Sequence, residues 1–299
     1  MIELVFLGTG SAVPTLKRNH PAIFLRYKEE NILFDCGEGT QRQFRKAKIN
    51  PCRLTKLFIT HWHGDHVLGI PGLLQTLAFN GYSRELEIFG PIGTKKFMNK
   101  IMNTFLLRKA IRFKITEGRK EDNNLVDNDD LLISGHLVNH RVPCFSYVFL
   151  RKSKLKIDKN KLSKLKIINS PLLRRLKEGK DVIIDGAKIK SNEITYTDNS
   201  FKITIITDTE FSERLINFAS NSDILICEST YLDDLDLANE YSHLTVEQAA
   251  IIAKNSNSKK LFLVHLSQKY EKREDDFLRE ARRIFKKVKV AEDMEKIVI

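Results

Sequence analysis

The sequence is poor in the features that stabilise secreted or membrane-bound chains. It has only four cysteines, Cys36, Cys52, Cys144 and Cys227, which lie far apart and form no Cys-x-x-Cys pair. Isolated thiols of this kind fit a reducing compartment better than a disulfide framework. No apolar run approaches the roughly 20 residues that cross a bilayer, and the N-terminus shows no signal-peptide pattern. We therefore expect a cytoplasmic protein with no membrane segment.

Acidic side chains are scarce in one part of the chain. Residues 151–190 contain 14 Lys and Arg but only 4 Asp and Glu, a local net charge of +10. The whole chain carries +12, so the remaining residues carry only +2 (12 − 10). A nearly neutral body with one basic segment indicates that this segment binds a polyanion. The alternative is a solubilising loop or a heat-adapted, lysine-rich surface.

Apolar runs typical of buried strands repeatedly end in an acid or a histidine. Helical patterns lie between these runs, and the order of strands and helices recurs in the second half of the chain. The carboxyl ends of strands are where open α/β sheets bind their substrates. The strand-ending residues are Asp35, His61, Asp208, Glu228 and His265.

The recurring order predicts an α/β fold in which two sheet-and-helix halves face each other, an αββα sandwich. We expect residues 1–299 to form a single domain, with 151–190 inserted as a projecting basic arm. A helix is predicted over 94–106, where Phe97, Ile101 and Phe105 recur at four-residue spacing. In the arm, 172–177 predicts a short helix and 181–186 a strand that returns to the body.

The segment His61-Trp62-His63-Gly64-Asp65-His66 carries the strongest chemical signal. Three imidazoles and a carboxylate fall within six residues, directly after a predicted strand. On a strand, residues 61 and 63 point the same way, and the following turn can bring 65 and 66 toward a second point. Imidazole and carboxylate are zinc-type ligands, so the spacing suits two adjacent metal ions. The alternative is a surface loop that is rich in histidine.

With Asp35, Asp208 and His265, this histidine cluster resembles the metallo-β-lactamase superfamily. Within it, the run Phe34-Asp35-Cys36-Gly37-Glu38-Gly39-Thr40-Gln41-Arg42-Gln43, the basic arm and His243 resemble the ribonuclease Z family. That family comprises the tRNA 3′ processing endonucleases, here in their short form. The resemblance extends from residue 1 to about residue 285.

The resemblance implies two Zn²⁺ ions per subunit, although Mn²⁺ or Fe²⁺ is not excluded. His136 competes with His140 as a ligand, and His140 is preferred because the Arg-Val-Pro after it resembles the family motif. Asp35 resembles an acid that orients ligand histidines without binding metal. The implied ligands are His61, His63 and His140 for one ion, Asp65, His66 and His265 for the other, and Asp208 as the bridge.

The family also implies a reaction, the removal of the 3′ trailer from precursor tRNA just after the discriminator base. The tRNA would keep a 3′ hydroxyl and the trailer a 5′ phosphate. Asp65 is the expected general base, and His243 the expected proton donor, oriented by Glu228. The resemblance also implies a homodimer. Residues expected to contact tRNA are Lys17, Arg18, Arg174, Arg175 and Lys177.

Two other functions fit parts of the pattern. A general phosphodiesterase or a glyoxalase-II-like thioester hydrolase would use the same fold and the same bridging Asp208. A small thioester needs no limb of net charge +10, so the arm favours an RNA-sized anion. An RNA-binding protein on a relict hydrolase fold is disfavoured by the complete ligand set.

Overall fold

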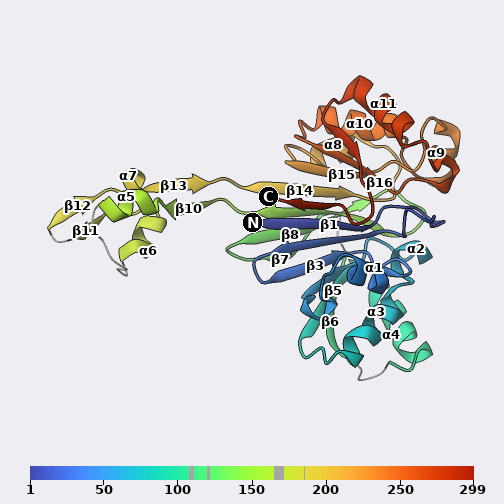
Figure 1. The fold of residues 1–299 in the computed structure, drawn as a ribbon, viewed down its shortest axis with the longest axis horizontal. Helices are drawn as coiled ribbons and strands as arrows, with labels where there is room; N and C mark the ends of the chain where they lie inside the picture. Colours follow the sequence, from blue (N-terminus) through green and yellow to red (C-terminus); the bar gives the residue numbers. More distant parts are fainter. Residues whose placement is uncertain (108–110, 120–121, 165–171, 185) are drawn as a thin grey trace.

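Two seven-stranded sheets lie face to face at the centre of the protein, and helices cover their outer faces (Figure 1). This computed structural model describes residues 1–107, 111–119, 122–164, 172–184 and 186–299. The predicted αββα sandwich is therefore confirmed. No helix in these described ranges is long and apolar enough to cross a membrane.

The first sheet is built mainly from the N-terminal half of the chain and the second from the C-terminal half. In spatial order, the first contains β18 (Lys296–Val298), β1 (Ile2–Gly8), β2 (Ala22–Tyr27), β3 (Glu30–Phe34), β4 (Lys56–Phe58), β5 (Glu85–Pro91) and β6 (Arg112–Gly118). The second contains β17 (Val288–Val290), β16 (Leu261–Val264), β15 (Ile224–Glu228), β14 (Phe201–Ile206), β9 (Cys144–Arg151), β8 (Leu131–Val138) and β7 (Asp122–Asp127).

The helices divide between the two outer faces in the same way. The first sheet is covered by α1 (Thr40–Lys46), α2 (Gly64–Val67), α3 (Ile70–Phe79) and α4 (Thr94–Thr104). The second is covered by α8 (Glu213–Phe218), α9 (Leu235–Tyr241), α10 (Val246–Asn255) and α11 (Glu274–Ile284). The short 3-10 turns are η1 (Pro51–Arg53) and η2 (Gln268–Tyr270).

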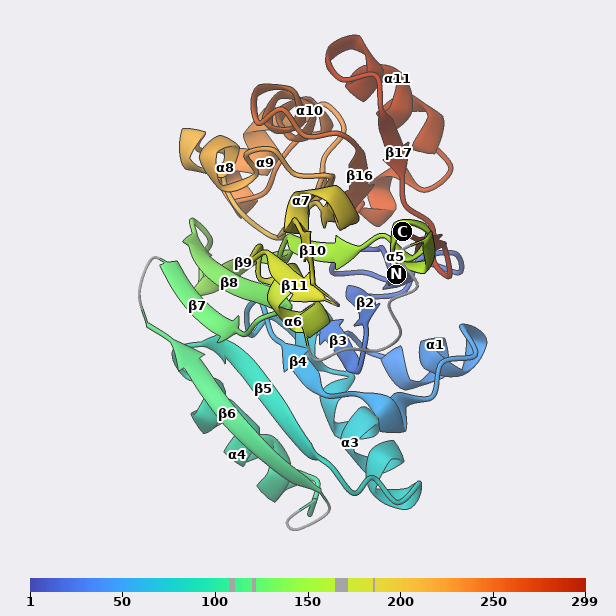
Figure 2. The same ribbon diagram turned by 90° about the vertical axis from the view of Figure 1, so that its left-hand side faces the viewer.

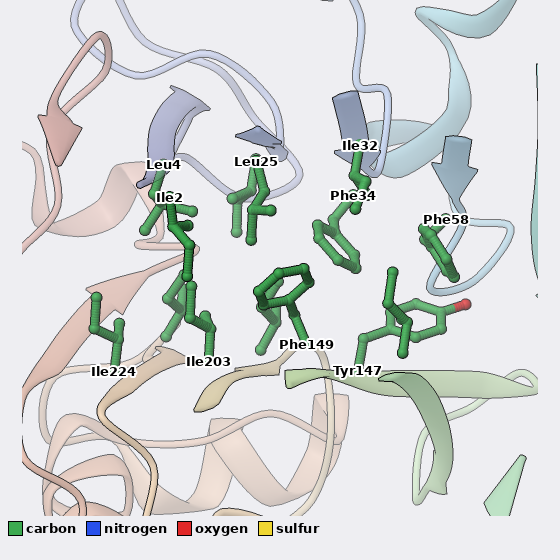
Figure 3. Packing of buried hydrophobic residues seen from close by; sticks show 14 of the residues in the cluster. Ile2, Leu4, Leu25, Ile32, Phe34, Phe58, Tyr147, Phe149, Ile203 and Ile224 are labelled. Atoms are coloured by element: carbon green, nitrogen blue, oxygen red, sulfur yellow. The ribbon is translucent and has the colours of Figure 1, made fainter. Parts of the chain in front are cut away.

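Side chains from both sheets interlock in the layer between them (Figure 3). Strand β1 reads as an almost unbroken apolar run because it is buried on both faces. Ile2, Leu4 and Phe6 enter the layer between the sheets, whereas Val5 and Leu7 pack under the helices. The pleat of the strand, with side chains alternating between faces, sorts one sequence into two cores.

Parallel pairing brings the strand-ending residues to one edge of the sandwich. β14, β15 and β16 run parallel, as do β3 and β4, so their carboxyl ends share this edge. Asp35 and His265, which directly follow β3 and β16, adopt positive φ angles of 57° and 61°. Such backbone is uncommon for residues other than glycine and often marks a functional site.

The basic arm leaves the sandwich between β9 and β14 and extends far from it (Figures 1 and 2). Its stalk is an antiparallel pair, β10 (Lys154–Ile157) and β13 (Thr195–Asp198). It has its own small core around Leu176, Val182, Ile189 and Ile194. The remaining elements are α5 (Lys159–Lys164), α6 (Leu172–Lys177), β11 (Val182–Ile184), β12 (Ala187–Ile189) and α7 (Ser191–Ile194).

The arm corrects one expectation from the sequence. The strand predicted over 181–186 exists as β11, but it pairs with β12 in a hairpin at the far end of the arm. β13 is the strand that returns to the body, so the projecting segment continues past residue 190. A short apolar run such as Val182-Ile183-Ile184 indicates a strand without identifying its partner, which is why the return was placed too early.

Helix α4 forms as predicted but buries a different face. Phe97 and Phe105 are 37% and 55% exposed, and the buried side chains are Thr94, Met98 and Met102. The two stripes have the same four-residue spacing and differ by a rotation of about 100° per residue. Phe97 packs instead against Trp62, with ring centroids 5.0 Å apart.

A buried tyrosine ties the second sheet to the strand that precedes the histidine cluster. The Tyr147 hydroxyl donates a hydrogen bond of 2.6 Å to the Ile59 carbonyl, two residues before His61. We expect Tyr147→Phe to lower the free energy of unfolding by about 1–2 kcal/mol, because a buried carbonyl loses its partner. Denaturant unfolding measures this change. Tyr27→Phe is the control, since its buried ring has no hydroxyl hydrogen bond among the described residues, and an equal loss there would contradict the prediction.

Candidate metal centre and active site

Three histidines converge at the shared strand edge. His61 follows β4, His63 is the N-cap residue of α2, and His140 lies in the turn between β8 and β9. Nδ1 of His63 is 3.0 Å from Nε2 of His61 and 3.2 Å from Nε2 of His140. These three nitrogens therefore surround one point, and a single cation there would be held by all three.

A second group lies directly beside the first. It contains Asp65, His66, Asp208 and His265, and its ligand atoms lie within 4.8 Å of one another. Oδ2 of Asp65 is 3.3 Å from Nε2 of His66 and 3.4 Å from Nε2 of His265. Helix α2 supplies Asp65 and His66, and Asp208 and His265 lie just after strands β14 and β16.

Asp208 lies between the two groups. Its Oδ2 atom is 3.4 Å from Nε2 of His66 and 3.7 Å from Nε2 of His61, while Oδ1 is 3.4 Å from Nε2 of His265. One carboxylate thus faces histidines of both groups, the position needed for a bridging ligand. The side chain is only 3% exposed, so this charge requires local compensation.

Protein groups form hydrogen bonds with the histidine nitrogens that face away from the ligand groups. Nδ1 of His66 is 2.7 Å from Oδ2 of Asp35, and Nδ1 of His140 is 3.1 Å from the carbonyl of Ser242. Such partners fix the ring so that the other nitrogen faces the site. The orienting role expected for Asp35 has this geometry, whereas Ser242 was not anticipated because a backbone carbonyl carries no sequence signal.

The electrostatics favour the metal-binding forms of the first group's three histidines and of the two carboxylates. Burial is the largest influence on the pKa values of His61, His63 and His140 and lowers all three, which favours neutral rings. Burial alone would raise the pKa values of Asp65 and Asp208, but the surrounding histidines outweigh it and hold both below the ordinary value. Neutral imidazole and ionised carboxylate are the forms that bind metal.

The second group fits a cation for a further reason. Burial lowers the pKa of His66, but Asp208, Asp35 and Asp65 outweigh it and raise the pKa well above the ordinary value. The pocket is therefore negative enough to retain a positive charge. Nε2 of His66 and Oδ1 of Asp208 are buried and find no hydrogen-bond partner among the described residues. A cation bound in this group would satisfy these atoms and the excess of negative charge.

An acid–histidine pair flanks the proposed metal centre. Nδ1 of His243 is 3.0 Å from Oε1 of Glu228, which is fully buried, and 4.0 Å from Oδ2 of Asp208. Burial lowers the pKa of His243, but Glu228 outweighs it and raises the pKa to about 9. The ring is therefore protonated at neutral pH and able to give a proton to a nearby oxygen.

Some expected site residues lie elsewhere. His136, the alternative to His140, is on β8 with its ring 4.2 Å from that of Phe218, outside both ligand groups. Arg18 is turned inward, where its guanidinium donates to the Thr9 hydroxyl and the Ala291 carbonyl, both at 2.7 Å. Its donors are therefore used inside the protein, while the neighbouring Lys17 is exposed. A basic dipeptide does not reveal which of its members points outward.

The expected arm contacts lie on α6, far from the metal centre. Arg174, Arg175 and Lys177 are exposed there, and Arg174 forms an ion pair with Glu178. In the described part of the chain, Arg175 and Lys177 form no ion pair, so both are available to phosphate groups.

Known proteins are similar in sequence to nearly the whole chain. Ribonuclease Z from Nanoarchaeum equitans is 42% identical over 269 residues, covering 90% of this chain and 84% of that protein. Ribonuclease Z from Enterococcus faecalis is 35% identical and covers 100% of this chain and 97% of its own. The family model described as the anti-Pycsar protein Apyc1 matches residues 2–113, which include the histidine cluster.

Solved structures with a similar fold cover nearly the whole chain. The short form of human tRNase Z (ELAC1) superposes with a TM-score of 0.72 at 27% identity, covering 99% of both chains. YhfI from Bacillus subtilis, a metallo-β-lactamase fold protein, has a TM-score of 0.71 over 99% of this chain and 98% of its own, and at 17% identity it supports the fold alone.

The sandwich and its two ligand groups define a hydrolase of the metallo-β-lactamase fold. Within this class, the chain belongs to the ribonuclease Z family.

The two candidate histidines after β7 provide a direct test of the metal centre. We expect His140→Ala to bind one metal ion per subunit at least tenfold more weakly, because the first group loses one of three ligands. His136→Ala is the matched control and should retain both ions, since this ring lies outside both groups. Elemental analysis after dialysis against graded chelator measures the content. Equal loss in both variants would contradict the assignment.

Proposed function

We propose that this protein is a metal-dependent endoribonuclease that removes the 3′ trailer from precursor tRNA after the discriminator base. The proposal rests on membership of the ribonuclease Z family. The observation that carries the chemistry is the Asp208 carboxylate, which faces both ligand groups and lies 4.0 Å from His243. The products would be a tRNA with a 3′ hydroxyl and a trailer with a 5′ phosphate.

We assign two Zn²⁺ ions to the centre, held by the three histidines of the first group and by Asp65, His66 and His265 of the second, with Asp208 between them. Two bound ions would lower the pKa of an attacking water and neutralise the charge on the phosphate. Asp65 lies at the margin of the second group with its side chain 10% exposed, so it is placed to accept the proton of that water.

His243 supplies the complementary proton. The leaving 3′ oxygen must be protonated as its bond to phosphorus breaks, and the Glu228 carboxylate raises the pKa of His243, which favours the protonated ring. Glu228 keeps it so through the 3.0 Å contact to Nδ1, which leaves Nε2 free to face the substrate. Both residues are supplied by the second half of the chain.

The arm supports a substrate much larger than the reacting phosphate. It leaves β9 and enters β14 at the end opposite the ligands, so β14, with six residues, separates it from the metals by about 20 Å. In Figure 1, the arm and α2, which carries Asp65 and His66, lie on opposite sides of the sandwich. An arm directed away from its own metals favours a homodimer in which it holds tRNA for the partner's site.

A small-molecule diesterase or thioesterase fits these observations less well. The arm has its own core and exposed basic residues, which a small substrate does not need. We also propose a cytoplasmic location, where the protein would encounter precursor tRNA. The free state of the four cysteines suits that reducing compartment.

Cleavage mapping is the first test of the proposed function. The purified protein with Zn²⁺ should cut a trailer-bearing precursor tRNA once, after the discriminator base, and chelation should abolish the cut. Asp65→Ala should lower kcat by at least 100-fold, because a metal ligand and the proposed base are lost together. Glu240→Ala, an exposed acid on α9, is the control and should cut normally. A protein that holds two metals and leaves the RNA intact would contradict the proposal.

Mixing two inactive variants tests whether the arm acts across a dimer. One variant replaces 154–198 with a short turn, which is feasible because Arg151 and Phe201 are paired neighbours. The other is Asp65→Ala with its arm intact. Each alone should cut precursor tRNA poorly, while the armless form should still hydrolyse a small phosphodiester. After joint refolding, heterodimers should regain activity toward an upper limit near half that of the wild type, and no recovery would contradict action across the dimer.

A further inference from the structure

Two threonine hydroxyls occupy matching positions behind the proposed metal centre. Thr60 lies between Asp35 and His61 in the first half, and Thr230 lies between Glu228 and His265 in the second. Thr60 is fully buried and Thr230 is 5% exposed. The metal-ligand pattern in the sequence includes neither residue, and their positions became visible only in the folded protein.

The hydrogen bonds of Thr230 have a fixed direction. Its Oγ1 atom is 2.7 Å from Oε2 of Glu228 and 2.8 Å from Nδ1 of His265. An ionised carboxylate only accepts hydrogen bonds, so the single hydroxyl proton must point to Glu228. Oε1 of Glu228 also accepts the backbone N–H of Thr209 at 3.0 Å, and Oε2 accepts that of Thr230 at 3.2 Å, so the carboxylate acts as an acceptor at both oxygens.

The oxygen of Thr230 can then only accept from His265. Nδ1 of that ring must carry the proton, and Nε2 is left with a free lone pair. Nε2 is the atom that faces Asp65 and Asp208, at 3.4 Å from each. The direction of one hydroxyl therefore determines which nitrogen of His265 faces the second ligand group.

The same geometry recurs in the first half. Thr60 Oγ1 is 2.8 Å from Oδ2 of Asp35 and 3.0 Å from Nδ1 of His61. Asp35 also contacts His66 directly at 2.7 Å, as Glu228 contacts His243 directly at 3.0 Å. Each buried acid thus contacts one histidine directly and is connected to a second histidine through a threonine hydroxyl.

We propose that Thr230 is a positioning residue that transmits the orienting effect of Glu228 to His265 and thereby fixes the lone pair that binds the second metal ion. Glu228 then aligns the proton donor His243 and the metal ligand His265 at the same time. This inference rests on the ligand assignment in the proposed function and adds to it a residue that touches neither metal nor substrate.

Thr230→Val tests the inference, because valine has nearly the shape of threonine but no hydroxyl. We expect one ion per subunit to bind with wild-type affinity and the other about 10- to 100-fold more weakly, the usual cost of losing such a partner. Thr230→Ser should restore the affinity. Thr204→Val is the control, since Thr204 is fully buried and its hydroxyl, among the described residues, bonds to that of Ser222 at 2.6 Å, away from the ligands. Zn²⁺ competition with a chromophoric chelator measures each affinity.

Imidazole NMR provides a second readout that does not depend on RNA. The chain has only eight histidines, so ¹⁵N spectra can assign the protonated nitrogen of His265. The wild type and Thr230→Ser should protonate Nδ1, whereas Thr230→Val should show both tautomers. Wild-type metal affinity together with an unchanged His265 tautomer in Thr230→Val would overturn the inference. Normal metal and NMR results in a wild type that fails to cut precursor tRNA would contradict only the proposed function.

Discussion

The organisation of this protein depends on burying ionised carboxylates at the edge where two sheets meet. Asp35, Asp208 and Glu228 are almost completely excluded from solvent. A buried charge is costly unless positive or hydrogen-bonding groups surround it. Here the histidines and threonines of both halves supply those groups, and the proposed metal ions would complete the compensation. Asp208 in particular gains its histidine neighbours His61 and His66 only when the two halves pack together.

The arm differs from the ligand-bearing edge in having its own small core. Asp35 and His265, which end two strands with positive φ, are each held by a hydrogen bond with a threonine, Thr60 and Thr230 respectively. The arm has a separate small core and joins the sandwich through one antiparallel stalk. Recognition of a large anion can thus change with the arm's sequence without disturbing the metal centre, because few contacts connect the two.

Much of the fold and the candidate site could be predicted from local sequence. The helix predicted over 172–177 has the same bounds as α6, and the two sheets form the predicted sandwich. Local signals were less informative about partners. The pattern over 181–186 indicated a strand but not its pairing with β12, and the phenylalanine stripe of α4 competed with the Met98 and Met102 stripe. Pairing and helix rotation depend on neighbours that are distant in the chain.

By itself, the sequence determined which residue types end the strands, and hence that His61, His63, Asp65 and His66 would be presented together. Adjacent residues must share an edge whatever the rest of the chain does, so this part follows from backbone geometry. Only the tertiary structure decided that His140, and not His136, joins them, that Arg18 points inward, and that Thr60 and Thr230 stand behind the ligands. These choices depend on how the two sheets pack, because the atoms concerned meet only when distant segments come within hydrogen-bonding distance.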